Sequence, residues 1–397
     1  MPYLSRRALE GLRAYEYKPA GYTYLDKIHA PFYNWCVERL PMWLAPNLIT
    51  LTGTIGLVIA YCVSAWYSPD FAADPDPPRW VFLLSAVAVV AYVHLDCLDG
   101  KQARRTKSSS PLGQLFDHGC DALSVNLLLA NIGVSLSMPC SWAHGLGNFG
   151  VMLTWILAQW EEYHTSIMLY GNSFYGVLEA NYCIAAVHLV TFVAGPQLWR
   201  LPATAILPLK ILEGVQLNSL LITMMVFVGS YQGLCNMYRV FFSFDHRTLT
   251  AKEAGHKQLG LRAAVLQFIA IVAPLAISTV WLWAPTTEPF LCRATSINVG
   301  LVYALMASRL IMAHMCKEPF APPLLMIAGM AVGAANSRLR LASPLALTVA
   351  LDAVALLAYL HYVLSVINEI CAFLGIRCLS LQRPAAAAGA AAEDKAD

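Results

Sequence analysis

Long hydrophobic runs separated by short polar connections fill most of this chain. A transmembrane helix needs about 20 consecutive, mainly apolar residues, and about ten runs approach or exceed that length. We therefore predict an all-α integral membrane protein, a polytopic bundle of about ten transmembrane helices. The predicted spans are residues 48–67, 80–97, 119–138, 147–169, 181–200, 216–240, 259–284, 296–314, 322–336 and 342–373.

Composition supports this class and excludes others. Hydrophobic residues make up 58% of the 397 positions and charged residues 13%, about half the charged share of a typical soluble domain. A soluble enzyme and a disordered chain are therefore excluded. The net charge of +2 gives no indication of nucleic-acid binding. The 11 cysteines show neither metal-ligand spacing nor a CxxC pair, and their odd number predicts no disulfide framework.

The segment before the first span has a different pattern. Its stretch HAPFYNWCVERLPMWLAPNLITL, which begins at His29, alternates aromatic with polar residues and predicts an amphipathic helix in the membrane interface. Lysines and arginines concentrate in this N-terminal segment, after the second span and after the sixth span. With ten spans, all three places lie on one side of the membrane. The positive-inside rule assigns that side to the cytosol.

Four aspartates lie where the second predicted span ends and the third begins, in LDCLDGKQARRTKSSSPLGQLFDHGCDAL. Asp96 and Asp99 are three residues apart and share one helical face. Asp117 and Asp121 are four residues apart and share another. The glycines, proline and serines between the two pairs can turn the chain back. We therefore expect two antiparallel helices to present four carboxylates to one point near the cytosolic interface.

This acidic cluster points to metal-assisted chemistry on phosphate. Four carboxylates at one point need counter-charge, because like charges at short range repel. Oxygen ligands select hard cations such as Mg²⁺ or Mn²⁺, and two such ions suit phosphate transfer. Arg104 stands beside the cluster, where it can bind a phosphate through two hydrogen bonds. Gly100 and Gly113 let a diphosphate approach the backbone, and they can serve the turn as well.

The same segment resembles the signature of the CDP-alcohol phosphotransferase family, D-x2-D-G-x2-A-R-x8-G-x3-D-x3-D, with every spacing kept. Its inner stretch and the upstream WLAPNLITL are similar to the eukaryotic choline/ethanolamine phosphotransferase branch. The resemblance is dense over about residues 43–124. The matching positions are Asp96, Asp99, Gly100, Ala103, Arg104, Gly113, Asp117 and Asp121.

The resemblance implies an activity, a cofactor and a location. A family member of this branch transfers phosphoethanolamine or phosphocholine from CDP-ethanolamine or CDP-choline to diacylglycerol, and it releases CMP. The products are phosphatidylethanolamine and phosphatidylcholine. Two Mg²⁺ or Mn²⁺ ions would be held by Asp96, Asp99, Asp117 and Asp121. The resemblance also implies a homodimer in the endoplasmic reticulum or Golgi membrane, with its active site facing the cytosol.

Further roles follow from the same resemblance. Arg104 would bind the diphosphate and Asn47 would contact the nucleotide. His118 matches the position of the proton acceptor, and Asp121 is the rival for that role. Glu161, in the fourth predicted span, is a candidate for the substrate ammonium group. An acidic side chain inside a span is costly and is a functional candidate by default.

Other readings of the chain remain open at this point. A same-family transferase with a different alcohol acceptor shares the aspartate motif. A transporter would share the span count, but the acidic residues gather at one interface rather than along a path at the midplane. An intramembrane prenyltransferase would need a second Asp-rich loop, and residues 200–380 hold only scattered acidic residues.

We predict four regions along the chain. Residues 1–47 form the cytosolic N-terminus with the interfacial helix. Residues 48–200 form the catalytic transmembrane part, with the Asp-rich motif at 96–121. Residues 201–380 supply further transmembrane helices for lipid access and dimer contacts. Residues 381–397, which are rich in alanine, form a disordered tail.

Overall fold

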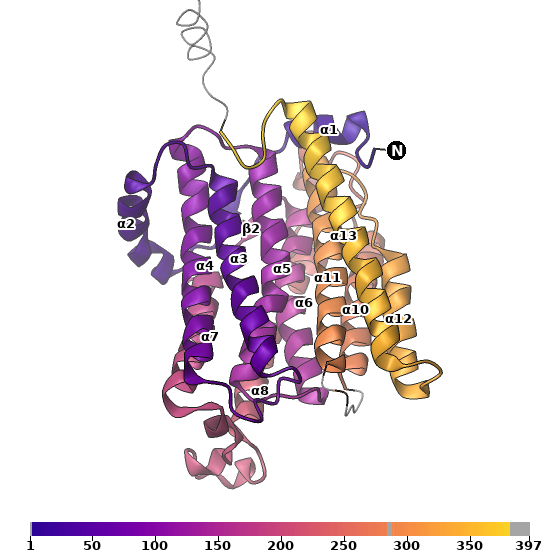
Figure 1. Ribbon diagram of the computed structural model, residues 1–397. Coiled ribbons are helices and arrows are strands. Elements are labelled where there is room, and N and C mark those ends of the chain that lie inside the picture. The colour runs from indigo at the N-terminus through magenta and orange to yellow at the C-terminus, as the bar shows by residue number, and fades with distance from the viewer. Residues whose placement is uncertain (1, 284–287, 289, 382–397) are drawn as a thin grey trace, which may run out of the picture.

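The computed structural model describes residues 2–283, 288 and 290–381. Ten helices stand side by side in a bundle, and each overlaps one of the ten predicted spans (Figure 1). The all-α polytopic class is therefore confirmed. The bundle helices are α3 (Pro46–Tyr67), α4 (Arg79–Arg105), α5 (Pro111–Ser135), α6 (Trp142–Thr165), α7 (Val177–Ala194), α8 (Leu217–Tyr238), α10 (Leu261–Leu282), α11 (Leu291–Cys316), α12 (Leu324–Leu339) and α13 (Pro344–Leu374).

Seven helices of the described chain are long and apolar enough to cross a membrane by themselves: α3, α4, α7, α8, α10, α11 and α13. The other three bundle helices fall short for identifiable reasons. Helix α12 has 16 residues. Helices α5 and α6 carry the acidic and histidine side chains that the sequence analysis singled out. These polar side chains lower the apolarity of α5 and α6, whereas α4, which carries Asp96 and Asp99, remains apolar enough to span.

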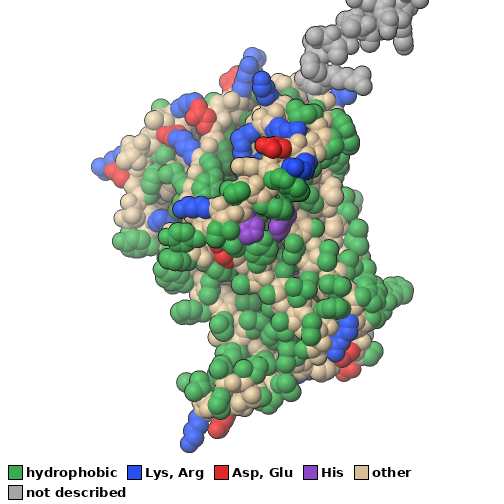
Figure 2. Space-filling model, turned by 90° about the vertical axis from the view of Figure 1, so that its left-hand side faces the viewer, with side chains coloured by type: hydrophobic (Ala, Val, Ile, Leu, Met, Phe, Trp, Pro, Cys, Tyr) green, Lys and Arg blue, Asp and Glu red, His purple; other side chains and the backbone are tan. Residues whose placement is uncertain are grey.

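The distribution of charge over the surface fits a membrane protein. Lysine, arginine, aspartate and glutamate side chains gather at the upper end of the molecule, and a broad band below them is mostly hydrophobic (Figure 2). The N-terminus lies at this upper end, as does the segment that follows α13 (Figure 1). Both segments lie at the same end because the chain passes along the bundle an even number of times between them.

The predicted interfacial helix is α2 (Tyr24–Arg39), which lies against the flank of the bundle near its upper end (Figure 1). Thr23 and Asp26 form a capping box at its start, which satisfies two backbone N–H groups. The Nζ atom of Lys101 donates to Asn34 Oδ1 at 2.8 Å, and this bond holds α2 to α4. Three large apolar side chains of α2 point outward and are about half exposed or more: Ile28, Phe32 and Trp35.

The N-terminal segment is fastened to the last helix of the bundle. The backbone N–H groups of Tyr3 and Leu4 each donate to a carboxylate oxygen of Glu369 in α13, both at 2.8 Å. Arg7 in α1 (Arg6–Arg13) forms two hydrogen bonds with Glu318, at 2.9 and 3.0 Å. These bonds join the N-terminal segment to α13 and to the connection between α11 and α12.

Short elements complete the chain. Strands β1 (Pro19–Ala20) and β2 (Met168–Leu169) form a parallel pair, so the N-terminal segment lies beside the α6–α7 connection. The remaining short elements are η1 (Pro196–Arg200), η2 (Ala203–Ala205), η3 (Lys210–Leu212), η4 (Arg239–Ser243), η5 (His246–Thr248) and α9 (Ala251–Ala254).

A disulfide joins Cys140, in the α5–α6 connection, to Cys292, near the start of α11. The expectation of no disulfide was therefore wrong. The two cysteines are 152 residues apart in sequence, and no local spacing pattern marks such a pair. Both lie at the lower end of the bundle, opposite the N-terminus.

We expect the disulfide to stabilise the bundle. Replacing both Cys140 and Cys292 with serine should lower stability by about 2–4 kcal/mol, because the bond closes a long loop. Thermal unfolding of the purified protein in detergent measures this loss. Reductant should lower the melting temperature of the original chain and leave the double variant unchanged. A melting temperature that reductant does not affect would show that the pair is not bonded.

Candidate active site

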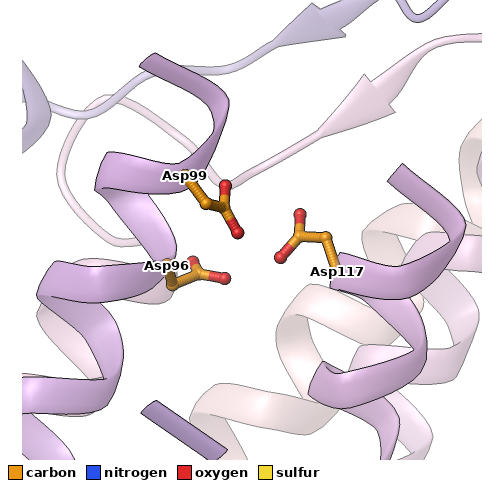
Figure 3. Close-up of side chains that lie close together, drawn as sticks. All are labelled: Asp96, Asp99 and Asp117. Carbon is orange, nitrogen blue, oxygen red and sulfur yellow. The ribbon is translucent and has the colours of Figure 1, made fainter. Parts of the chain in front are cut away.

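Three carboxylates converge between the upper ends of α4 and α5. Asp96 and Asp99 project from one helix toward Asp117 on the other (Figure 3). One ligand oxygen from each of the three lies within 4.8 Å of the others. The chain reverses between the two helices at residues 106–110, and this turn sets them antiparallel. The predicted meeting of the two aspartate pairs is thus realised for three of the four side chains.

The oxygens of this cluster are suited to a cation. Asp96 Oδ1 and Asp117 Oδ1 are shielded from solvent, and neither has a hydrogen-bond partner among the described residues. Asp99 Oδ2 accepts a hydrogen bond from the hydroxyl of Thr50 in α3. Buried acceptors without donors are costly, and a hard divalent cation satisfies them. The donor set therefore fits the Mg²⁺ or Mn²⁺ that the sequence predicts.

Asp121 lies outside the group of three, one helical turn further along α5 than Asp117. Its Oδ1 accepts a hydrogen bond from the hydroxyl of Tyr92 in α4. This bond fixes the carboxylate and leaves Oδ2 free of a described donor. Thr50 and Tyr92 were not foreseen in the sequence, because neither belongs to the aspartate motif. The hydroxyl of Thr50 orients the Asp99 carboxylate, and the hydroxyl of Tyr92 orients the Asp121 carboxylate.

A cavity of about 2010 Å³ contains the cluster. Its upper part is polar and includes every residue of the aspartate motif that the sequence analysis named. Its deeper part runs between α5, α6, α7 and α8 and is lined by apolar side chains such as Leu128, Trp155, Ile184 and Met225. A charged end and an apolar end thus belong to one continuous space. The predicted site residues in its lining are Asn47, Asp96, Asp99, Gly100, Arg104, Gly113, Asp117, His118 and Asp121.

Gly100 and Gly113 lie inside helices α4 and α5, so they are not turn residues as we had allowed. The reversal uses residues 106–110 instead, with Lys107 at a positive φ of 55°. A Cβ atom at position 100 would come no closer than 3.6 Å to the Arg104 guanidinium. At position 113 the nearest atom would be Asn47 Oδ1, also at 3.6 Å. The space that both glycines leave is therefore open to a ligand.

Asn47 is buried at the start of α3 and already has a partner. Its Nδ2 donates to the backbone oxygen of Cys378 at 2.9 Å. Residues 376–378, 380 and 381 also line the cavity. The segment that follows α13 thus turns back over the upper end of the bundle and reaches the predicted nucleotide position (Figure 1). Of the predicted tail at 381–397, only Leu381 lies within the described residues.

His118 projects into the cavity from α5, one residue after Asp117. Its side chain is 4% exposed, and its Nδ1 has no hydrogen-bond partner in the described chain. The ring of Tyr17 stands edge-on at 6.0 Å between centroids. An imidazole nitrogen that is buried and unpaired beside the carboxylate cluster is available for proton transfer.

The N-terminal segment closes one side of the cavity. Tyr15, Tyr17 and Tyr22 line it, together with Tyr170 from the α6–α7 connection. Burial raises the pKa of Tyr17 and of Tyr170 above the ordinary tyrosine value, so both phenols stay neutral at physiological pH. No sequence motif predicts that these tyrosines lie together. The β1–β2 pairing that brings them close joins segments far apart in the chain.

Glu161 does not belong to this group, contrary to our expectation of an ammonium contact. It lies outside the cavity lining, and its carboxylate forms two hydrogen bonds with Arg239, one of them 2.7 Å from Nη2 to Oε2. The Glu161 side chain is 3% exposed, whereas that of Arg239 is 32% exposed. A buried carboxylate needs such a partner. Its presence inside a span is explained by this ion pair between α6 and η4.

Comparison with known proteins agrees with this site. A family model described as CDP-alcohol phosphatidyltransferase matches residues 43–207. Choline/ethanolaminephosphotransferase 1 of Arabidopsis thaliana is 31% identical over 411 residues, covering 96% of this chain and 99% of the relative. The chain belongs to the CDP-alcohol phosphatidyltransferase family. The resemblance read from the aspartate motif is thereby confirmed, and it extends over nearly the whole chain.

Relatives with different named activities match the chain to a similar degree. Ethanolaminephosphotransferase 1 of Mus musculus is 30% identical over 410 residues, covering 96% of this chain and 95% of the relative. Cholinephosphotransferase 1 of Xenopus laevis is 32% identical over 326 residues, covering 79% of this chain and 75% of the relative. Identity to these family members therefore does not choose between the two headgroups.

The Glu161–Arg239 pair predicts a structural effect of mutation. Glu161→Gln should lower stability by roughly 2 kcal/mol, which is less than the loss of a fully buried pair because Arg239 is partly exposed. The ratio of kcat/KM for CDP-ethanolamine and CDP-choline should stay unchanged. Adding Arg239→Gln to this variant should recover part of the melting temperature. A changed ratio at unchanged stability would return Glu161 to the headgroup site.

Proposed function

We propose that this protein transfers phosphoethanolamine or phosphocholine from CDP-ethanolamine or CDP-choline to diacylglycerol. CMP is released, and phosphatidylethanolamine or phosphatidylcholine is formed. One observation carries the proposal: the carboxylate cluster and Arg104 share a single cavity with a deep apolar compartment. A site for a charged nucleotide diphosphate and a site for acyl chains therefore meet at the carboxylates.

Placement of the donor substrate follows from the polar end of this cavity. Arg104 binds the diphosphate, and Gly100 and Gly113 allow it to approach α4 and α5 closely. Asn47 contacts the nucleotide at the opening. Two Mg²⁺ or Mn²⁺ ions, held by Asp96, Asp99, Asp117 and Asp121, would supply neutralisation of the diphosphate charge.

Proton transfer is assigned to His118. The diacylglycerol hydroxyl enters from the apolar compartment with its acyl chains among α5, α6, α7 and α8. His118 accepts the hydroxyl proton, and the oxygen attacks the phosphorus next to the alcohol. The bond from that phosphorus to the CMP oxygen breaks, and CMP leaves with the electron pair. Positioning and charge neutralisation supply most of the rate in such transfers. Asp121 is the alternative base, since its Oδ2 lacks a described donor.

Location and assembly are further parts of the proposal. The carboxylate cluster lies at the end of the bundle opposite the Cys140–Cys292 disulfide, which supports a cytosolic active site. We place the protein in the endoplasmic reticulum or Golgi membrane. A homodimer is proposed as well, with contacts among the helices of residues 201–380. In the apolar stretches of α8 and α13, only 11% and 22% of the residues are buried within the chain, which leaves wide faces for lipid or a second copy.

The alternative within the family is transfer to a different alcohol. The apolar compartment favours a lipid acceptor over a small polar alcohol, because it holds only scattered polar groups beside its apolar lining. A transporter is not favoured by any feature of the site. An assay of the purified protein with CDP-choline and CDP-ethanolamine in competition, and with diacylglycerol as acceptor, tests the proposal. Lack of turnover with both donors would overturn it.

Metal dependence gives a second test. Excess chelator should abolish turnover, and Mg²⁺ or Mn²⁺ should restore it. Asp99→Asn should remove nearly all activity while the melting temperature changes little, because asparagine keeps the shape of the side chain. Asp76→Asn, an exposed aspartate outside the cavity, serves as the matched control. Full activity in excess chelator would contradict the metal assignment.

The base assignment has its own variant. His118→Ala should lower kcat by at least about tenfold, because a positioned base contributes roughly 10²–10⁴-fold. Binding of CDP-choline and of Mn²⁺, measured by calorimetry, should survive. If kcat were unchanged, Asp121 would become the base, and Asp121→Asn would be the next variant to measure.

A further inference from the structure

The N-terminal segment and the α6–α7 connection are held together above the active site. Met168 N donates to Lys18 O, and Tyr170 N donates to Ala20 O, each at 3.0 Å. These two bonds fix residues 15–22 against residues 168–171. As a result, tyrosines that are about 150 positions apart in sequence line one wall of the cavity.

The rings of this wall contact one another and the reacting end of the site. Tyr17 and Tyr170 share a hydrogen bond between their hydroxyl groups. The rings of Tyr22 and Tyr170 lie 5.8 Å apart at 31°. Tyr17 stands edge-on to His118 at 6.0 Å. The tyrosine wall, defined as Tyr17, Tyr22 and Tyr170, therefore begins beside the proposed base and extends toward the opening.

Free carboxylates are scarce around this wall. Apart from the four aspartates of the motif, Asp26 is the one acidic residue among the described residues that line the cavity. Its Oδ2 accepts the N–H of Thr23 at 2.8 Å as part of the α2 capping box. The carboxylate of Glu161 is bound to Arg239 outside the cavity. Apart from the motif aspartates and the capping residue Asp26, a cation at the wall would thus meet phenol rings.

We propose that the tyrosine wall binds the ammonium end of the CDP-alcohol and favours a quaternary over a primary ammonium. This inference rests on the proposed function. The headgroup is attached to the phosphate that sits at the aspartate cluster, so it must lie close to Asp117 and His118, where the wall begins. A trimethylammonium group donates no hydrogen bonds and is attracted to the faces of aromatic rings. A primary ammonium gains most from a carboxylate partner, which this wall lacks.

The test separates headgroup recognition from folding. Tyr22→Leu and Tyr170→Leu remove a ring each, and Tyr22→Phe keeps the ring without the hydroxyl. We expect each leucine variant to weaken CDP-choline binding about tenfold by calorimetry with Mn²⁺, while CMP, which lacks the headgroup, binds as before. Tyr22→Phe should bind CDP-choline within about twofold of the original chain. The matched control is Tyr24→Leu, because Tyr24 packs on Phe174 outside the cavity.

The outcomes are distinct. Equal losses for CMP and CDP-choline would show that the wall only supports the fold and would overturn the inference. Unchanged CDP-choline binding in both leucine variants would overturn it too, as would a higher kcat/KM for CDP-ethanolamine than for CDP-choline in the original chain. The proposed function survives all three of these results. It falls, together with the inference, if the original chain turns over neither donor.

Discussion

Mutual repulsion among carboxylates is the constraint around which this structure is organised. Asp96, Asp99 and Asp117 place oxygens within 4.8 Å of one another between two helices. Such a group is stable only when a cation or protons balance it and when the helices cannot separate. Thr50 in α3 and Tyr92 in α4 bind two of the motif's carboxylates. Packing of α3 against both α4 and α5 closes the group from a third side.

The cavity that contains the carboxylates has two chemically different ends. Its polar end gathers the groups that bind charge, and its apolar end lies between helices with wide lipid-facing surfaces. A hydroxyl carried by a lipid can therefore reach the cluster without its acyl chains leaving an apolar environment. In the proposed reaction, the aqueous substrate approaches from the other end. The proposed chemistry would take place where the two environments meet, near the end of the bundle where the cluster lies.

The sequence predicted the ten helices and the aspartate group because both depend on local patterns. Hydrophobic runs mark helices, and spacings of three and four mark a common helical face. What it could not predict depends on long-range pairing. The Cys140–Cys292 bond and the contact between Asn47 and Cys378 join positions far apart in the chain. The partner of Glu161 could not be predicted for the same reason, since Arg239 belongs to another helical element.

The active site is built from both ends of the chain. Its carboxylates lie in α4 and α5, yet the N-terminal segment that covers them is held by Glu369 in α13, and Asn47 is held by a segment beyond α13. During synthesis the four aspartates leave the ribosome long before these contacts can form. The site therefore reaches its final form only after the last helix has entered the membrane. An incompletely made chain holds the aspartates but lacks the enclosure that would make them an enzyme.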